Sequence, residues 1–232
     1  MNKPRAPVAS LEPLLNPRTV AIIGASQDES RIGGMPIRYM QRYGYSGEIF
    51  PINPKHRKIQ GLDAHARIGD IGKEIDVAIM AVPAKIAVEI AEECAAAGVK
   101  SICAFTSGFA EMDKDGKDKQ NRLRAIAENY GIRILGPNCL GYFNTSFRYY
   151  ATFSTSILHG EPQSGNIGLV SQSGAFGSHC FVLGRERGLG FTYMITTGNE
   201  VDVDVADCIA YLAQHQETKV IAVYMEGCQD GE

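Results

Sequence analysis

Short runs of apolar residues, many of them β-branched, recur along the chain and alternate with segments long enough to form helices. Continuous apolar runs of this kind are typical of strands buried on both faces of a parallel sheet. The intervening segments predict right-handed crossover helices. In the first part of the chain, the predicted strands are 20–23, 48–52, 77–82, 101–105 and 133–135, and the predicted helices are 35–43, 84–97 and 121–130. The pattern therefore predicts a doubly wound α/β fold.

Each of these predicted strands is followed by small, polar or proline residues. Ligands of doubly wound sheets bind beyond the carboxyl ends of the strands, so these residues should border one cleft. At the first strand end, a glycine-containing turn leads into a helix, and we expect the loop amides and the helix N terminus to bind a phosphate. The five strand ends are Gly24-Ala25-Ser26, Asn53-Pro54-Lys55, Val82-Pro83-Ala84, Thr106-Ser107-Gly108 and Pro137-Asn138-Cys139.

The alternation stops between residues 143 and 163 and then resumes. This aromatic and Ser/Thr-rich stretch predicts a crossing between domains, with a short strand at 151–153. Beyond it, we predict strands at 167–170, 191–196 and 220–225 and helices at 175–187 and 203–214. The pattern thus predicts two domains, residues 1–146 and residues 147–232. Because three strands leave apolar edges open, the second domain should pack on the first domain and an oligomeric partner, or continue beyond residue 232.

Composition narrows the class of protein. A hydrophobic fraction of 44% with 21% charged residues is ordinary for a globular domain, and a net charge of −3 gives no overall attraction to nucleic acid or anionic membranes. No apolar run approaches the ~20 residues of a membrane span, and the first fifteen residues lack the core of a secretory signal. The six cysteines show no metal-ligand spacing. We expect a soluble cytoplasmic protein that binds neither metal, nucleic acid nor membrane.

The first two strand ends indicate which nucleotide would bind. The loop Gly24-Ala25-Ser26 differs from the Gly-x-Gly-x-x-Gly of dinucleotide enzymes. After the second strand, Lys55 stands where an NAD enzyme places an acidic residue for the ribose. A lysine there suits the additional ribose phosphate that NADP and coenzyme A share. The alternative is that residues 55–58 form only a solvated basic turn. NAD is disfavoured, and an NADP oxidoreductase stays open.

A second strand-to-helix junction offers another anion site. The hydroxyls of Ser171 and Ser173 and the amides around Gly174 could hold an anion, although a serine in this position often only caps the helix. A serine hydrolase is disfavoured because Gly-x-Ser-x-Gly is absent. Glu226 ends the last strand at the same edge of the sheet, where it could orient a histidine or act as a general base, or lie on the surface.

Taken together, the motifs resemble the NDP-forming acyl-CoA synthetases, the superfamily that includes the α subunit of succinyl-CoA synthetase. The resemblance spans nearly the whole chain, in order and spacing. It rests on residues 20–26, 51–55, 136–141, 170–174, 198–202 and 226–227. It implies a Rossmann-like CoA-binding domain followed by a flavodoxin-like ligase domain, which is partial here.

This resemblance also implies a chemistry and a set of residues. Family members join a carboxylic acid to CoA with ATP or GTP, through an acyl phosphate and a phosphohistidine. By position, Ser171, Ser173 and Gly174 would hold the phosphoryl group and Glu226 would orient the phosphohistidine. The implied CoA contacts are Gly24, Ser26, Lys55, Val82, Pro83, Ser107 and Asn138.

The chain departs from the family in one large respect. The family's phosphohistidine lies on a Gly-His loop downstream of the glutamate, and none of the five histidines here has that context. An ATP-grasp domain is absent too. We therefore expect a complete CoA site and half of a catalytic site, with ATP or ADP bound by an ATP-grasp domain or subunit and no turnover by this chain alone. The alternatives are a CoA-binding or regulatory module without catalysis and the CoA-binding region of an acetyltransferase fusion.

The acid that would be joined to CoA stays open between short aliphatic and aromatic acids. Residues 143–153, together with Tyr142, Tyr149 and Tyr150, are predicted to border the acid pocket. Their rings would permit an aromatic acid without requiring one.

Overall fold

The first sheet contains five parallel strands in the order β2-β1-β5-β6-β7, within a computed structural model that describes residues 11–158 and 160–228. The strand order changes direction between β1 and β5, which is where ligands bind in doubly wound sheets. The predicted α/β fold is thus confirmed for this part of the chain. The strands are β1 (Thr19–Ile23), β2 (Glu48–Ile52), β5 (Val77–Met80), β6 (Ser101–Ala104) and β7 (Arg133–Leu135).

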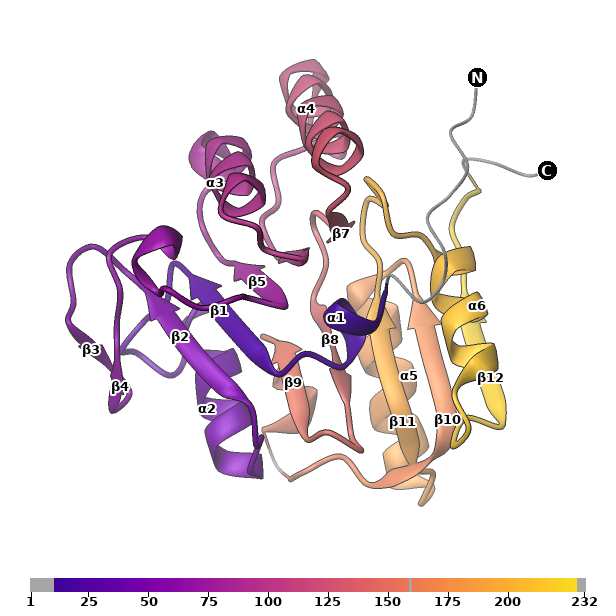
Figure 1. Ribbon diagram of the computed structural model, residues 1–232. Coiled ribbons are helices and arrows are strands. Elements are labelled where there is room, and N and C mark those ends of the chain that lie inside the picture. The colour runs from indigo at the N-terminus through magenta and orange to yellow at the C-terminus, as the bar shows by residue number, and fades with distance from the viewer. Residues whose placement is uncertain (1–10, 159, 229–232) are drawn as a thin grey trace.

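Helices cover both faces of this sheet (Figure 1). Helix α2 (Met35–Tyr43) lies on one face, and α3 (Ala84–Ala96) and α4 (Lys114–Tyr130) lie on the other. Helix α4 begins at Lys114 and not near residue 121 as predicted, because the Asp113 carboxylate accepts a hydrogen bond from the Gly116 amide at 2.8 Å and caps the helix. A small hairpin, β3 (Lys58–Ile59) and β4 (Leu62–Asp63), and a 3-10 turn, η2 (Ile68–Asp70), occupy the predicted connection after β2.

The second sheet has five strands and not the three predicted, in the order β12-β10-β11-β8-β9. The additional strands β8 and β9 form an antiparallel hairpin, and β8 also pairs with β11. The short strand predicted at 151–153 overlaps β9, whereas β8 was not predicted, because its aromatic residues are buried through contacts with distant strands. The turn of this hairpin contains the predicted domain division at residue 146. The strands are β8 (Gly141–Asn144), β9 (Tyr149–Thr152), β10 (Ser164–Ser171), β11 (Phe191–Thr196) and β12 (Val220–Tyr224).

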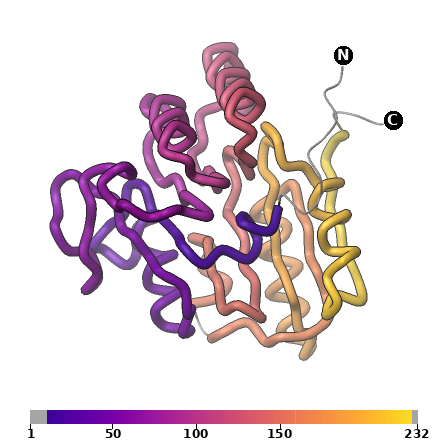
Figure 2. The backbone as a smooth tube through the Cα atoms, in the orientation of Figure 1, coloured from indigo at the N-terminus to yellow at the C-terminus, as the bar shows by residue number. Residues whose placement is uncertain are grey.

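Helices α5 (Gly174–Glu186) and α6 (Val205–Gln214) lie on opposite faces of this sheet (Figure 1). Strands β10, β11 and β12 are parallel, and β12 forms one edge of the sheet. A second 3-10 turn, η3 (Thr155–Ile157), follows β9. The tube in Figure 2 follows the backbone from the first sheet through the β8–β9 hairpin into the rest of the second sheet.

A backbone seam joins the two sheets. Val203 pairs with Leu135 in a parallel bridge, and the amides of Val201 and Asn199 donate to the carbonyls of Gly136 and Pro137, both at 2.9 Å. Beside the seam, the buried Arg133 guanidinium contacts two carboxylates of the second domain. Its Nε lies 2.9 Å from Asp202 Oδ2 and its Nη2 lies 2.6 Å from Asp207 Oδ2.

The N-terminal helix α1 (Glu12–Leu15) and helix α2 also connect the two domains. In α1, Leu14 and Leu15 are fully buried, and Glu12 accepts a hydrogen bond from Tyr211 Oη at 2.6 Å. From α2, Tyr39 Oη donates to the carbonyl of Ser154 at 2.9 Å. Because one apolar core includes residues of both sheets, the two domains pack as one body.

Residues 11–158 and 160–228 contain neither a candidate membrane span nor a candidate metal-binding cluster. Over these ranges, no helix combines the length and the apolar character needed to cross a membrane. Within the same ranges, no group of three or more His, Cys, Asp and Glu side chains is placed to hold a metal ion.

Replacing Arg133 should destabilise the fold strongly. Arg133→Met would leave Asp202 and Asp207 partly buried without their cation, and we expect a loss of ~3–5 kcal/mol in the free energy of unfolding, measured with urea. The matched control is Arg122→Met, because the Arg122 pair with Glu89 is exposed and should contribute less than ~1 kcal/mol. Similar small losses in both variants would contradict a structural role for the buried pair.

Candidate functional site

Two neighbouring cavities lie at the carboxyl ends of the strands. The larger, of about 790 Å³, is lined by segments that follow β5, β6 and β7 of the first sheet and β10, β11 and β12 of the second. The strand ends of both sheets therefore face one space. Among the predicted site residues, this cavity is lined by Val82, Pro83, Ser107, Asn138, Ser173, Gly174 and Glu226.

Hydrogen bonds between successive strand ends align the first-domain wall of this cavity. Thr106 Oγ1 donates to the carbonyl of Val82 at 2.7 Å, and the Asn138 amide donates to the carbonyl of Thr106 at 2.9 Å. The segments after β5, β6 and β7 are thus connected to one another. From the second domain, Asn199 reaches this wall, where its side chain accepts a hydrogen bond from Asn138 Nδ2 at 3.2 Å.

The smaller cavity, of about 590 Å³, lies beside β1 and β2. It is lined by the predicted residues Gly24 and Ser26, and also by Arg31 and His56. The two cavities meet, since Ile32 and Ala81 line both. Gly24 has a φ of +82°, and a Cβ atom at this position would lie 2.4 Å from the Ala81 carbonyl oxygen. Only glycine therefore lets the loop approach β5 this closely.

The amides of the first loop are bonded within the protein, contrary to the expectation that they face a phosphate. The Gly24 and Ala25 amides both donate to the Ile52 carbonyl, at 3.1 and 3.2 Å, and the Ser26 amide donates to the Gly33 carbonyl at 3.3 Å. Side chains supply the cations at this cavity instead. Arg31, whose Nε lies 3.6 Å from Asp28 Oδ2, is largely exposed, which leaves it accessible to an anion.

Lys55 lies outside the linings of both cavities. Its side chain is exposed, and its backbone amide donates to Asn53 Oδ1 at 2.9 Å, which forms a turn. Its neighbour His56 lines the smaller cavity. The role assigned to Lys55 from the sequence stays a prediction.

At the serine junction, the two hydroxyls differ in their surroundings. Ser171 is fully buried and its Oγ donates to the Ser173 carbonyl at 2.6 Å. Ser173 Oγ accepts a hydrogen bond from the Phe176 amide at 3.3 Å and caps α5. A capping hydroxyl still carries a hydrogen to donate. The first helical residues, Gly174 and Ala175, line the larger cavity, and their amides have no acceptor within the helix.

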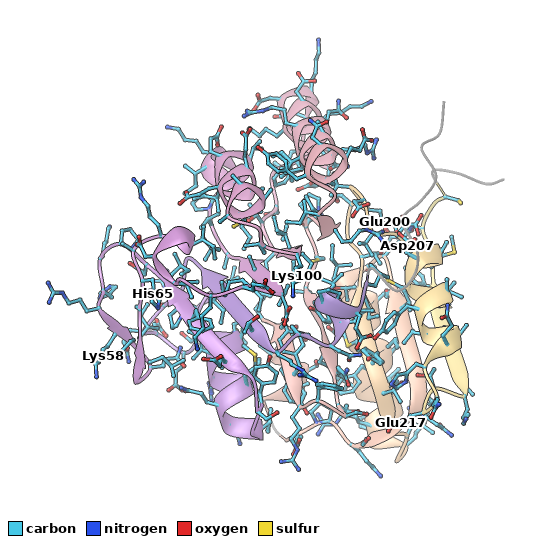
Figure 3. All side chains as sticks on the ribbon, viewed as in Figure 1. Lys58, His65, Lys100, Glu200, Asp207 and Glu217 are labelled. Atoms are coloured by element: carbon cyan, nitrogen blue, oxygen red, sulfur yellow. The ribbon has the colours of Figure 1, made fainter. Side chains whose placement is uncertain are left out.

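Two carboxylates lie near this junction (Figure 3 labels Glu200). Glu226 is exposed and lines the larger cavity just beyond β12. Glu200, only 8% exposed, accepts hydrogen bonds from Thr197 Oγ1 at 2.8 Å and Gln172 Nε2 at 2.9 Å. Burial raises the pKa of Glu200 above its ordinary value, against the opposing effect of these hydrogen bonds.

The tyrosines predicted to border an acid pocket line neither cavity. Tyr142, Tyr149 and Tyr150 are fully buried in the core, so that prediction is wrong for them. The aromatic wall of the larger cavity is formed by Phe105 and Phe153, whose ring centroids lie 5.0 Å apart.

Sequence reasoning missed several other lining residues. Ile32 is an apolar residue in an otherwise polar loop, and this contrast was the available signal for it. Gln172 lies within the serine motif, but its type suggested no chemistry. Arg31 and His56 could not be chosen over neighbouring charged residues from sequence alone.

Comparison with known proteins gives two family matches. Residues 18–145 match the model of a CoA binding domain, and residues 164–232 match that of a succinyl-CoA ligase like flavodoxin domain.

Similar proteins include longer ligases. The chain is 38% identical to the α subunit of acetate–CoA ligase [ADP-forming] II of Pyrococcus furiosus, over 95% of this chain and 47% of that protein. It is 33% identical to a trans-feruloyl-CoA synthase from an unknown prokaryotic organism, over 93% of this chain and 31% of that protein. The chain thus spans about half or less of the length of these relatives.

A solved structure has the same fold. The dinucleotide forming acetyl-coenzyme A synthetase 1 of Ca. Korarchaeum cryptofilum, in complex with phosphate and ADP, superimposes with a TM-score of 0.89 at 34% identity. The match covers 95% of this chain and 46% of that one.

Adding a methyl group at Gly24 should disturb both cavities. Gly24→Ala would combine an unfavourable positive φ with a contact against the Ala81 carbonyl, and we expect a loss of more than ~2 kcal/mol in unfolding free energy. Gly72→Ala is the control, because Gly72 also has a positive φ but open space at its Cβ position, and it should cost ~1 kcal/mol. Equal losses, measured by urea unfolding, would contradict the close approach at Gly24.

Proposed function

Because the chain belongs to the CoA binding domain family, whose model its residues 18–145 match, we propose that it binds coenzyme A in the two connected cavities. The nucleotide end would occupy the smaller cavity, where Arg31 and His56 can meet phosphate groups. The pantetheine arm would pass Ile32 and Ala81 into the larger cavity. The observation that carries the proposal is this connection between a smaller cavity lined by Arg31 and a larger cavity whose wall is in part apolar.

The proposed CoA contacts are those inferred from the sequence. Six of the seven line one of the two cavities, and Lys55 is the exception. A long flexible side chain at an exposed position can still reach a phosphate outside the lining. The proposed set is Gly24, Ser26, Lys55, Val82, Pro83, Ser107 and Asn138.

We further propose that the chain is the CoA-binding portion of an acid–CoA ligase. The reaction would convert a carboxylic acid, CoA and ATP into acyl-CoA, ADP and phosphate. Support comes from the match of residues 164–232 to a succinyl-CoA ligase like domain and from the names of the longer relatives. The larger cavity supports this proposal because the proposed CoA contacts Val82, Pro83, Ser107 and Asn138 and the first residues of α5 line one space.

In this proposal, the second domain holds a phosphoryl group during the transfer. The Gly174 amide and the Ser173 hydroxyl would donate to it, and buried Ser171 would fix the loop through its bond to Ser173. Glu226 would accept a hydrogen bond from a histidine supplied by another segment or subunit and fix its orientation. An ATP-grasp domain or subunit would bind the nucleotide, in an oligomer.

The proposed division of labour follows the two predicted domains, with CoA binding in residues 1–146 and ligase chemistry in residues 147–232. We propose a cytoplasmic location, which suits the buried thiols of Cys94, Cys103 and Cys208.

A CoA-binding module without catalysis is the second candidate. One observation favours it: among residues 11–158 and 160–228, no histidine lines the larger cavity. Both candidates require CoA binding, and they differ in whether addition of an ATP-grasp partner gives turnover.

Calorimetric titration of the purified chain with CoA tests the shared requirement. We expect saturable binding of CoA and no heat with NADP, because the larger cavity, which joins the smaller one at Ile32 and Ala81, can accept a pantetheine arm. A well-folded chain that fails to bind CoA would overturn the proposal, and binding of NADP alone would favour an oxidoreductase.

Substitution of Lys55 and Arg31 locates the ribose phosphate. If Lys55 contacts the 3′-phosphate, Lys55→Ala should weaken CoA binding by ~1–2 kcal/mol, and dephospho-CoA should bind mutant and wild type alike. Arg31→Ala is the matched variant, since Arg31 lines the smaller cavity. Unchanged CoA affinity in Lys55→Ala would remove Lys55 from the site, and a loss in Arg31→Ala alone would assign an anion contact to Arg31.

A further inference from the structure

The pairing of β12 ends at Tyr224, two residues before Glu226, which lines the larger cavity. Its last ladder hydrogen bond runs from the Gln172 amide to the Tyr224 carbonyl, at 3.0 Å. Beyond this point the Gln172 side chain continues the pairing. Its Oε1 accepts hydrogen bonds from the Glu226 and Gly227 amides at 2.5 and 3.0 Å, and its Nε2 donates to the Gly227 carbonyl at 2.8 Å. The side-chain amide thus acts in place of a peptide group of a neighbouring strand.

Glu200 helps to fix the orientation of the Gln172 side-chain amide. Gln172 Nε2 also donates to Glu200 Oε2 at 2.9 Å, and an ionised carboxylate can only accept hydrogen bonds. The reverse orientation would place Gln172 Oε1 against the carboxylate and its NH₂ group against two backbone amides. Glu200 is itself fixed, because its Oε1 accepts from Thr197 Oγ1 at 2.8 Å and from the Val205 amide at 3.1 Å.

We propose that Gln172 and Glu200 are positioning residues for Glu226. Glu200 orients the Gln172 amide, and Gln172 holds the backbone of residues 226 and 227 so that Glu226 lies at the wall of the larger cavity. We call these hydrogen bonds between the Gln172 side chain and the backbone of residues 226 and 227 the clamp. Residues 226 and 227 need such a restraint because they are exposed and follow an edge strand. The inference rests on the proposed function for the role of Glu226, while the clamp itself can be measured without that function.

Hydrogen exchange of the Glu226 and Gly227 amides, followed by NMR in the whole chain, measures the clamp directly. Gln172→Ala removes the acceptor and should increase both exchange rates about 5- to 10-fold. Glu200→Gln should do the same, although it is isosteric, because its NH₂ group would face another donor, either Gln172 Nε2 or the Val205 amide. Gln214→Ala, at an exposed position of α6, should leave both rates unchanged.

A double substitution separates orientation from simple loss of structure. Gln172→Glu alone places two carboxylates against each other and should also speed exchange. Combined with Glu200→Gln, it restores a donor facing an acceptor, and the carboxylate at position 172 can still accept both backbone amides. We expect the double variant to exchange more slowly than Gln172→Glu alone but faster than the unmodified chain, because the Gly227 carbonyl has lost its donor. Unchanged exchange in Glu200→Gln, or a double variant no slower than Gln172→Glu alone, would overturn the proposal.

Inorganic phosphate provides the functional test. If Glu226 faces an anion at the α5 N terminus, Glu226→Gln should strengthen phosphate binding about threefold, by removing a like charge. This gain should disappear when Gln172→Ala is also present, because Glu226 is then no longer held at the cavity wall. An equal gain in both backgrounds would overturn the positioning role. Absence of phosphate binding in every variant would count against the proposed phosphoryl site, and the exchange rates would still decide the clamp.

Discussion

The backbone seam between residues 134–138 and 199–203 sets the position of one sheet relative to the other, and the larger cavity exists only because of that position. The same segment that forms the seam also lines the cavity, through Gly198 and Asn199. Gly198 has a φ of +61°, and a Cβ atom there would lie 2.3 Å from the Pro137 carbonyl oxygen, so the approach of the two loops requires glycine. Buried Arg133 adds an ion pair with Asp202 beside the seam. The same Asp202 carboxylate also accepts a hydrogen bond from the Ile134 backbone amide at 2.8 Å. A movement at the seam would therefore change the shape of the cavity directly.

Other contacts restrain such a movement from elsewhere in the molecule. Leu14 and Leu15 of α1 are buried in the shared core, and Glu12 of the same helix accepts a hydrogen bond from Tyr211 of α6. Tyr39 of α2 donates a hydrogen bond to the Ser154 carbonyl of the second domain. These contacts lie apart from the seam in the sequence and in the fold. Since interdomain motion is the usual expectation for a small polar interface, the shared apolar core makes this pair of domains a comparatively rigid wall for a ligand.

The local hydrophobic pattern predicted those strands and helices whose own residues show which of their faces are buried. Strand β2 and helix α2 have the predicted bounds, because an apolar run or an amphipathic period identifies each of them without reference to distant residues. Strand β8 was missed and β9 was predicted only in part, as a short strand at 151–153, since Tyr142 and Tyr149 are buried by pairing that crosses the domains. At the site, the expectation that ligands bind beyond the carboxyl ends of the strands identified most of the cavity wall. It could not show that the Gly24 amide is already bonded to Ile52, or that Gln172 acts through its side chain.

The charges around the larger cavity act in opposite directions on a bound anion. The α5 N terminus favours an anion, and Glu226 places a carboxylate in the same wall. Two negative groups so placed would repel each other unless a hydrogen-bond donor or cation lay between them. Among the described residues, no Lys, Arg or His side chain lines this cavity. An anion at the α5 N terminus would therefore be bound by hydrogen-bond donors such as the Gly174 amide and the Ser173 hydroxyl, with the Glu226 carboxylate opposing it.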